Sequence, residues 1–214
     1  MLVKDVMTKN PITVKGDVSV LEAKSLMNKN KISKLPVVDN SGRLTGIITR
    51  NDLIKASPSD ATTLDMYEMG YLLSKLTVEK TMKKDVIIVN VNETVENAAL
   101  LMSDNDIGCL PVMENDLIVG IITESDLFKC FIDMFNARKS GVRAVVKLNE
   151  KPGQLARLSS AAAECGANIV SLITSPAENS EFRIITMKLT GLTEEQFKKI
   201  SVPCDAEIID IRTV

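Results

Sequence analysis

The sequence predicts an α+β protein built from three successive modules, and two observations lead to that prediction. Residues 1–133 contain one pattern twice, because residues 35–53 return as residues 110–127 at a spacing of 75 positions that falls to 74. The last 74 residues follow a different order of expected elements: strand, helix, strand, strand, helix, strand. A repeat of this length is one supersecondary unit used twice, and two such units commonly bury their apolar faces against each other. A pseudo-twofold cleft between them is a common place for a small ligand.

Each copy is expected to follow the order β-α-β-β-α. In the first copy, Ser19 and Glu22 fit a capping box that opens a helix after a short strand, and apolar side chains then recur at helical spacing. A polar turn separates the next two strands of each copy, and a second helix follows them. The first copy has its strands at 12–14, 34–39 and 44–49 and its second helix from 51; the second copy has strands at 87–89, 109–113 and 117–123 and helices at 95–102 and 125–135.

The last module reads as βαββαβ. A Gly at position 166 ends its first helix, and Thr193 with Gln196 forms a capping box that opens its second. Strands are expected at 142–148, 169–174, 182–189 and 206–211, with the first helix at 154–165. The predicted boundaries are a first domain at 1–57, a linker helix at 58–76, a second domain at 77–135 and a third at 141–214.

Composition narrows the function classes. The chain has no His and its four Cys form no CxxC pair, which argues against a zinc site and against an imidazole base. Only 3% of the residues are aromatic and the net charge is −2, which disfavours nucleic acid as the main partner. No convincing catalytic motif or Gly-rich phosphate loop is present, so we expect no enzyme. No leader pattern or apolar run of membrane-spanning length is present, so we expect a cytoplasmic protein.

The two copies carry opposite charge. Residues 1–57 hold ten Lys and Arg against five Asp and Glu, a net of +5, whereas residues 77–133 hold four against eleven, a net of −7. The last 74 residues carry nine of each sign. Opposite fields attract two halves of a duplicated module and help to fix how they dock.

A Thr-x-x-Asp motif closes the second long strand of each copy. Thr49 with Asp52, and Thr123 with Asp126, fit a capping box at the start of the following helix. The same position also suits a ligand, because free amides there attract a phosphate and a carboxylate can hold a ribose diol. The two interpretations are compatible, and the residues alone leave both open.

The paired motifs resemble known families. Leu35-Pro36-Val37 with Gly46-Ile47-Ile48-Thr49, returning at residues 110–112 and 120–123, looks like two CBS domains, a pair called a Bateman module. Residues 142–212 resemble an ACT domain, which has a ferredoxin-like βαββαβ fold, through residues 150–155 and 165–169. The CBS–CBS–ACT order is similar to the acetoin-utilisation regulatory proteins. The resemblance implies a homodimeric regulatory protein that binds AMP, ADP, ATP or S-adenosylmethionine, and no other cofactor or metal.

The resemblance also implies the nucleotide-binding residues. Asp52 and Asp126 would hold ribose hydroxyls, with Thr49 and Thr123 beside them. The base would meet main-chain groups at Thr13, Val14, Lys34 and Leu35 in the first copy, and at Ile88, Val89, Cys109 and Leu110 in the second.

The two nucleotide sites are predicted to be unequal. The residue after the Thr is Arg50 in the first copy and Glu124 in the second, and a guanidinium binds a phosphate that a carboxylate repels. We therefore expect one phosphate-competent site that uses Arg50, Lys34 and Lys15. The other site would take a neutral adenosine-like or sulfonium ligand, or stay vacant. Side chains can reach across the pseudo-twofold, so Arg50 could serve either pocket.

The ACT resemblance implies an amino-acid site at a dimer interface. Its loop residues would be Asn149, Glu150, Gly153 and Leu155, facing Asn168 and Ile169 of the second strand or of a partner copy. Glu150 stands where the family usually has Asp or Asn, and a sheet that serves only for dimerisation is the alternative.

The expected function is thus a non-catalytic sensor whose ligand changes the angle between the CBS copies. The segment 135–140 would transmit this change to the ACT dimer and onward to an unidentified protein partner. The alternatives are a nucleic-acid-binding regulator, favoured by the basic first copy alone, and a purely structural dimerisation module without a ligand.

Overall fold

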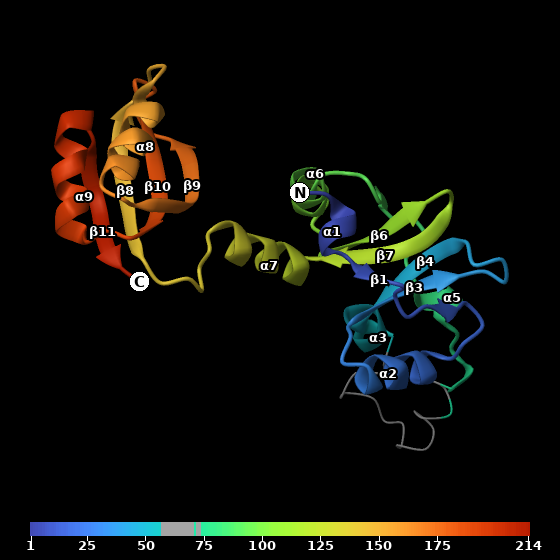
Figure 1. Ribbon diagram of the computed structural model, residues 1–214. Helices are drawn as coiled ribbons and strands as arrows, with labels where there is room; N and C mark the ends of the chain where they lie inside the picture. The colour runs from blue at the N-terminus through green and yellow to red at the C-terminus, as the bar shows by residue number, and fades with distance from the viewer. Residues whose placement is uncertain (57–70, 72–73) are drawn as a thin grey trace. The chain divides into compact units, whose positions relative to one another are not determined.

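The computed structural model describes residues 1–56, 71 and 74–214, so most of the predicted linker helix at 58–76 lies outside the described residues. The chain divides into two compact units, residues 1–127 and residues 128–214. The first unit contains both copies of the repeat and the second contains the βαββαβ module (Figure 1).

The first copy has the predicted β-α-β-β-α order. Strand β3 pairs in parallel with β2 and antiparallel with β4, which gives a mixed three-stranded sheet. Ser19 caps helix α2 by accepting a hydrogen bond from the Glu22 amide at 3.1 Å. The bounds are β2 Val14–Lys15, α2 Val20–Lys29, β3 Lys34–Val38, β4 Leu44–Thr49 and α3 Arg50–Lys55.

The second copy repeats this order in a four-stranded sheet, β1-β7-β6-β5. The fall in repeat spacing from 75 to 74 positions arises between its two long strands, where Asn115 and Asp116 both have positive φ, the backbone of a two-residue hairpin turn. The first copy uses the longer loop 39–43 instead, with Gly42 at a φ of 81°. The bounds are β5 Val89–Asn90, α6 Val95–Asp104, β6 Cys109–Glu114, β7 Leu117–Thr123 and α7 Glu124–Met134.

The first strand of each copy is displaced from its prediction. Strands were expected at 12–14 and 87–89, but β2 and β5 begin at Val14 and Val89 and make only two-residue ladders. The apolar side chains that suggested the earlier start are exposed, at 39% for Ile12 and 47% for Ile88. Apolar character alone therefore misplaced the strand ends.

The N-terminal segments of the two copies are exchanged. Helix α1 (Val3–Val6) buries Val3 in the core of the second copy, and α5 (Val78–Thr81) buries Val78 in the core of the first. Strand β1 (Thr8–Lys9) pairs with β7, and Lys83 makes the equivalent bridge to Ile47. These segments are too short to show a periodic pattern, so the exchange was not predicted.

Two glycines accommodate this exchange. A Cβ at Gly46 would collide with the sulfur of Met82, and a Cβ at Gly120 would collide with the sulfur of Met7. Both pairs are equivalent positions of the repeat, and in each pair the Met comes from the segment that enters the other copy. The close approach of that segment therefore requires the absence of a side chain at both glycines.

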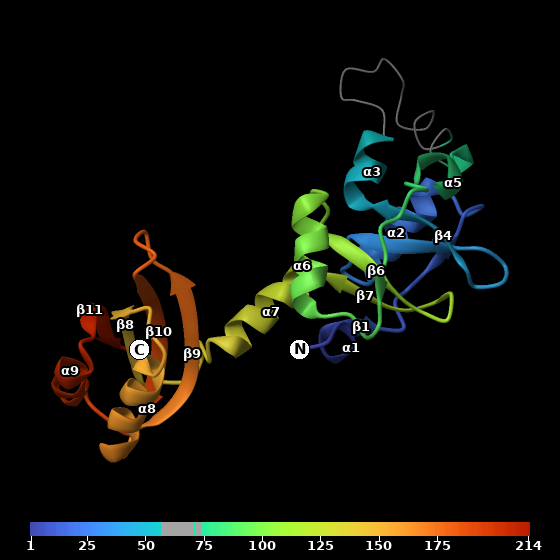
Figure 2. The ribbon, with the colours of Figure 1, turned by 90° about the horizontal axis from the view of Figure 1, so that it is seen from above.

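The second unit has the predicted βαββαβ order and an antiparallel sheet, β11-β8-β10-β9. This order, with β10 between β8 and β9, is the ferredoxin-like arrangement. Both helices pack on one face of the sheet, where Leu158 and Phe197 are fully buried (Figure 2). The bounds are β8 Val142–Asn149, α8 Gln154–Glu164, β9 Asn168–Pro176, β10 Phe182–Thr190, α9 Glu194–Ser201, the 3-10 helix Val202–Cys204 and β11 Glu207–Thr213.

The end of α7 and the residues that follow it belong to the second unit, and hydrogen bonds within that unit fix them. Asn136 has a φ of 46°, and the Ala137 amide donates to the Ile132 carbonyl at 2.9 Å, which completes a Schellman motif. The buried Lys188 ammonium donates to the carbonyls of Asn136 and Lys139, at 2.9 and 2.7 Å. Among the described residues, no helix is both long and apolar enough to cross a membrane.

Candidate functional site

The Thr-x-x-Asp motif of the first copy forms a complete capping box at the start of α3. Asp52 accepts hydrogen bonds through one oxygen, Oδ2, from the Thr49 amide at 2.9 Å and from the Thr49 hydroxyl at 2.7 Å. The Thr49 hydroxyl accepts from the Asp52 amide at 3.3 Å. Within the described part of the chain, no hydrogen bond reaches the other oxygen, Oδ1. The carboxylate is therefore fixed in orientation while one oxygen stays available.

The second copy repeats this geometry at the start of α7. Asp126 accepts through Oδ2 from the Thr123 amide at 3.0 Å and from the Thr123 hydroxyl at 2.8 Å. Asp126 is the more enclosed of the two acids, with 6% of its surface exposed. Both predicted pairs are thus brought together, and the cap explains their local conformation in each copy.

The residues predicted to meet the base lie at the starts of paired strands. Leu35 and Leu110 are among those whose side chains are buried, so such positions can present only their backbone to a ligand, whereas Ile88 is 47% exposed. The first-copy positions are Thr13 just before β2, Val14 in β2, and Lys34 and Leu35 in β3; the second-copy positions are Ile88 just before β5, Val89 in β5, and Cys109 and Leu110 in β6.

Lys34 crosses from the first copy to the second. Its ammonium donates a 2.5 Å hydrogen bond to the Gly108 carbonyl, and a Cβ on Gly108 would also lie 2.5 Å from a carboxylate oxygen of Glu124. The residue that aligns with Lys34 in the repeat is Cys109, which packs with Ile47 and Ile121 in a small apolar cluster between the copies. Burial raises the pKa of the Cys109 thiol, and the nearby Lys34 ammonium partly opposes that rise.

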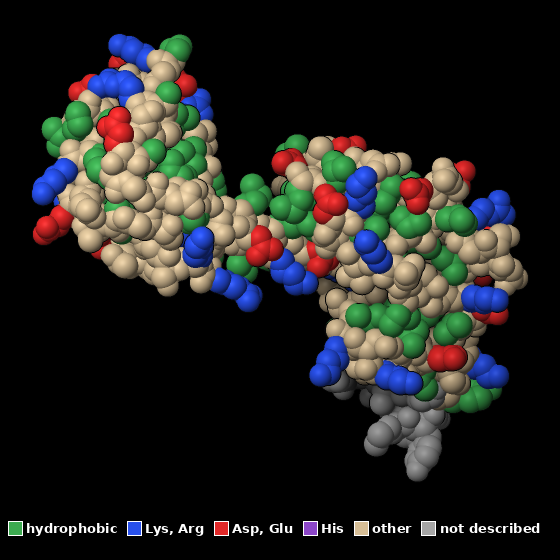
Figure 3. Space-filling view, in the orientation of Figure 1, with side chains coloured by type: hydrophobic (Ala, Val, Ile, Leu, Met, Phe, Trp, Pro, Cys, Tyr) green, Lys and Arg blue, Asp and Glu red, His purple; other side chains and the backbone are tan. Residues whose placement is uncertain are grey.

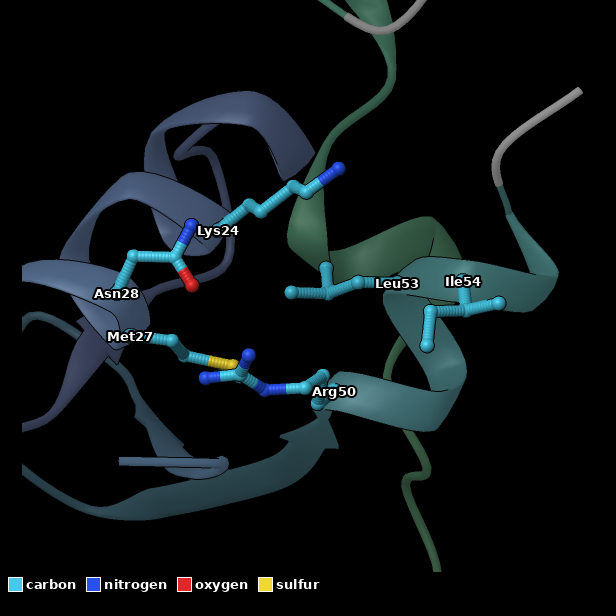
Figure 4. Close-up of a pocket in the computed structure, with 6 residues that line it drawn as sticks. All are labelled: Lys24, Met27, Asn28, Arg50, Leu53 and Ile54. Atoms are coloured by element: carbon cyan, nitrogen blue, oxygen red, sulfur yellow. The ribbon is translucent and has the colours of Figure 1, made fainter. Parts of the chain in front are cut away.

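Arg50 points into a groove between α2 and α3. The groove has a volume of about 270 Å³ and is lined by both apolar and basic side chains, and Figure 4 shows Arg50 extending from α3 toward Met27 on α2. The guanidinium donates to the Ile32 carbonyl at 3.1 Å. The lining residues are Lys24, Met27, Asn28, Arg50, Leu53 and Ile54.

A matching groove lies in the second copy. Its volume is about 410 Å³, and Met102, Ser103, Glu124 and Leu127 occupy the positions that align with Met27, Asn28, Arg50 and Leu53. The lining residues are Ala99, Met102, Ser103, Asp106, Ile107, Gly108, Glu124 and Leu127.

The surface around the first-copy groove is basic, because Lys and Arg side chains lie around α2 at the bottom of the first unit in Figure 3. The repeat pattern predicted roles for Arg50 and Glu124 but not for Lys24 and Asp106, because only the helix packing brings these two residues to the grooves.

The second unit has a cavity of about 300 Å³ at the loop between β8 and α8. Four of the predicted amino-acid-site residues line it: Asn149, Glu150, Gly153 and Leu155. Arg183 on β10 also lines it and forms an ion pair with Glu150.

Gln154 is a second residue of this cavity that sequence reasoning missed. Its side-chain oxygen is buried and accepts no hydrogen bond from the residues that the structure describes. An unsatisfied buried oxygen is rare in folded proteins and commonly marks a place for a missing partner.

The remaining two predicted residues of that site lie elsewhere. Asn168 and Ile169 pair with Thr190 and Leu189 at one end of β10, whereas the loop begins beside Phe182 at the other end. Seven strand residues separate the two ends, which is roughly 20 Å. Within one chain the six residues therefore do not meet, and a complete set would need a second copy.

The repeat region is similar to a known family and to several solved structures. A family model described as the CBS domain matches residues 3–59 and 78–133. A protein named for acetoin utilization (AcuB) from Vibrio cholerae is 31% identical, with a TM-score of 0.54, over 64% of this chain and 95% of that chain. The CBS domain pair of MJ0100, solved with 5′-methylthioadenosine and S-adenosyl-L-methionine, is 34% identical, with a TM-score of 0.52, over 65% and 98%. CBSX2, solved with AMP, is 27% identical, with a TM-score of 0.51, over 64% and 98%.

Some curated relatives are much longer than the matched region. The chain is 35% identical to L-aspartate semialdehyde sulfurtransferase of Methanocaldococcus jannaschii over 61% of its own length, but it spans only 23% of that protein. The described residues contain no group of three or more His, Cys, Asp or Glu that could hold a metal ion. Because the CBS model matches both copies of the repeat and more than half of the sequence, the chain belongs to the CBS domain family.

Proposed function

We propose that the CBS pair is a non-catalytic regulatory sensor of adenosine-containing ligands. The observation that carries the proposal is the Thr49–Asp52 box, which fixes the carboxylate through Oδ2 and leaves Oδ1 without a partner in the described residues. A fixed carboxylate with an available oxygen suits the paired hydroxyls of a ribose. The backbone at the strand starts would supply hydrogen bonds to the base.

The solved relatives support the choice of ligand class. One CBS pair was solved with 5′-methylthioadenosine and S-adenosyl-L-methionine, and another protein with AMP. The adenosine moiety is common to all three. We therefore propose that this chain binds AMP, ADP, ATP or S-adenosylmethionine. We do not propose a sulfurtransferase activity for it, because the chain spans only 23% of that longer relative.

The two sites are proposed to differ in the charge that they accept. Glu124 lies close to Gly108 and to the start of α7, where its carboxylate would repel a phosphate. Lys34 also reaches this region, although part of its hydrogen-bonding capacity is taken by the Gly108 carbonyl. Arg50 is turned into the α2–α3 groove, so a role as phosphate ligand would require it to leave the Ile32 carbonyl.

Thermal unfolding of the full chain with AMP, ADP, ATP, 5′-methylthioadenosine and S-adenosylmethionine tests the proposal. A ligand at a hundred times its Kd should add about 2.7 kcal/mol to the free energy of unfolding. Asp52→Ala and Asp126→Ala should each reduce the ligand-induced shift. Asp17→Ala, an exposed acid of the first copy outside the box, is the matched control.

Two outcomes would overturn this proposal. If no nucleotide raises the midpoint, the chain is a structural module; if both Asp variants respond like the control, the ligand does not use the box. A salt-dependent shift of labelled DNA without any nucleotide response would favour the nucleic-acid-binding alternative.

A second candidate site is the cavity beside Gln154. We propose that it takes a free amino acid, as the resemblance to ACT domains implies. The unsatisfied Gln154 oxygen could accept from an ammonium group, and the Arg183–Glu150 pair offers one charge of each sign to a zwitterion.

Titration calorimetry with a panel of amino acids tests this second site. Gln154→Leu should abolish binding while the chain stays folded, and Lys199→Ala, on α9 outside the cavity lining, should not. Absence of heat for every amino acid would contradict the proposal.

The proposed function includes a homodimer and a protein partner that receives the signal. Strand β9 supports a dimer, because it lies at an edge of the sheet and its nine residues carry no charge. Natural sheets commonly protect such an edge by covering or pairing it. Sedimentation equilibrium should give twice the chain mass of 23.4 kDa, and a monomer at micromolar concentration would contradict the dimer.

A further inference from the structure

The start of α7 carries one cationic and one anionic side chain that come from different copies of the repeat. Lys34 on β3 of the first copy and Glu124 at the first position of α7 meet at Gly108, the residue before β6. The Gly108 carbonyl accepts a 2.5 Å hydrogen bond from the Lys34 ammonium and a 3.3 Å hydrogen bond from the Glu124 amide. The first copy thereby delivers an ammonium group to the helix start that the Thr123–Asp126 box caps.

Gly108 leaves an open space between the two charges. A Cβ built on it would lie 2.5 Å from the Glu124 carboxylate and 3.1 Å from the Lys34 ammonium. Gly108 is not among the glycines with positive φ, so its backbone conformation does not require glycine. The aligned residue of the first copy is Ser33, whose carbonyl accepts the equivalent hydrogen bond from the Arg50 amide at 2.8 Å. The repeat thus tolerates a side chain at this position, and what Gly108 provides is space.

Both charged groups keep hydrogen-bonding capacity. The Lys34 ammonium has three N–H bonds, and among the described residues only the Gly108 carbonyl accepts from it. Within the same described part of the chain, the Glu124 carboxylate receives no hydrogen bond and forms no ion pair. The two groups therefore lie near each other without neutralising each other directly.

We propose that the second-copy site takes an adenosine whose 5′ substituent ends in a free amino-acid group. The Lys34 ammonium binds its α-carboxylate, and the Glu124 carboxylate binds its α-ammonium. The proposal rests on the proposed function, in which the Thr123–Asp126 box holds the ribose, and it places the 5′ substituent at the start of α7 beside Gly108. The two charges of an amino acid are separated by a single carbon atom, so they suit two opposite charges that face one small gap.

The same pair of charges disfavours a nucleotide at this site. A phosphate would gain from Lys34 but would face the Glu124 carboxylate across the gap, whereas a zwitterion pairs with both. The first copy has no such pair, because Arg50 aligns with Glu124 and Cys109 aligns with Lys34. The selection for an amino-acid tail is therefore a property of the second copy alone.

Titration calorimetry on the full chain carrying Asp52→Ala isolates the second-copy site. The probes are S-adenosylhomocysteine, whose tail is zwitterionic, and 5′-methylthioadenosine, which lacks the amino acid; neither has a phosphate or a sulfonium charge. S-adenosylhomocysteine should bind at least about ten-fold more tightly, because each charge-assisted hydrogen bond to the tail is worth about that factor. The ratio of the two affinities is the readout, since a general loss of stability would not change it.

Three variants should bring this ratio close to one while the binding of 5′-methylthioadenosine stays unchanged. Glu124→Gln removes the acid, Lys34→Met removes the cation, and Gly108→Ala fills the space between them. We expect Gly108→Ala to fold, because its Cβ would displace only the ends of two flexible side chains. The matched controls are Ser33→Ala, at the aligned position of the first copy, and Glu114→Gln, an exposed acid at the end of β6. Both controls should keep the ratio of the parent.

The outcomes separate this proposal from the proposed function. Equal affinities for the two probes, or a ratio that survives both Glu124→Gln and Lys34→Met, would show that these residues do not bind an amino-acid tail, while the sensor function would stand. Binding of AMP to the Asp52→Ala chain more tightly than S-adenosylhomocysteine would also overturn this proposal alone. If no adenosine compound binds even the parent chain, both proposals are wrong.

Discussion

The two copies of the repeat have the same backbone and different surfaces. Both use the same strand order, the same Thr–Asp capping box and the same Gly–Met contact with the segment from the other copy. They differ in net charge, in the length of one turn and in the groove residues Arg50 and Glu124. The contacts that specify the backbone are thus repeated, whereas the side chains available to ligands and partners are not.

At the interface between the copies, the side chains again differ although the backbone is repeated. Lys34 donates across it to the Gly108 carbonyl, but the position that aligns with Lys34 is Cys109, which cannot return an equivalent bond. The second helices differ as well, because α3 has six residues and α7 has eleven. Helix α7 runs across the boundary between the two units, which lies between residues 127 and 128.

The largest expected effect comes from the shared backbone contact. Gly46→Ala should destabilise the chain by about 1–3 kcal/mol, the usual cost of overpacking a filled site. Its Cβ would collide with the Met82 sulfur and lie 2.9 Å from the Lys83 carbonyl oxygen, whereas a Cβ at Gly120 meets only the flexible side chain of Met7, so Gly120→Ala should cost less. Urea unfolding measures both.

A double-mutant cycle identifies the cause of that effect. Met82→Ala should relieve part of the cost of Gly46→Ala, because the contact with the Lys83 carbonyl remains, but none of the cost of Gly120→Ala, because the exchanged segments enter different copies. Additive effects for Gly46 and Met82 would contradict the contact.

A smaller effect is expected where the copies diverge, at the end of α7. Lys188→Met keeps the apolar length of the side chain but removes both donations to residues 136 and 139, at a cost of about 1–2 kcal/mol. Hydrogen exchange should accelerate at residues 132–140 while the amides of β3 and β6 keep their protection. Lys198→Met, on the exposed face of α9, is the control. Unchanged exchange at residues 132–140 would show that Lys188 does not hold this segment.

A still smaller loss of stability is expected from removing the Lys34–Gly108 hydrogen bond, which the second copy cannot match. Lys34→Met removes one hydrogen bond to the Gly108 carbonyl, and we expect a loss of about 1 kcal/mol in the free energy of unfolding. Lys31→Met, an exposed lysine near the same strand, is the control. A loss no larger than that of the control would show that the cross-copy bond is not formed in solution.

Periodicity and cap signals predicted most of the fold. The helices of both copies and of the last module, and the long strands, have ends within about two residues of their predictions, because each carries an apolar period and a cap or turn residue. The short exchanged segments were not predicted, since four residues cannot show a period and their partners lie far away in the chain, 90 positions from Val3 to Glu93 and 60 positions from Val78 to Val18.

The candidate site was less accessible to sequence reasoning. The repeated motif predicted Thr49 and Asp52, because the helix cap and the ribose contact both need residues that are close in sequence at the start of one helix. The direction of Lys34 and Arg50 depends on the packing between copies and between helices, which a local pattern does not contain. The same holds for Gln154 and Arg183, which meet only when β10 lies beside the β8–α8 loop.

The smallest expected effect concerns Cys109, the residue that replaces Lys34 in the second copy. Burial raises the pKa of its thiol, so the reactive thiolate is scarce at pH 8, and a thiol reagent should label exposed Cys165 first. The native thiol also stays protonated above about pH 8.5, where an unfolded thiol ionises, so this group makes stability fall as pH rises through that range. Mass spectrometry of labelled peptides follows both residues separately. Equal labelling rates for Cys109 and Cys165 would mean that the two copies do not close over this position.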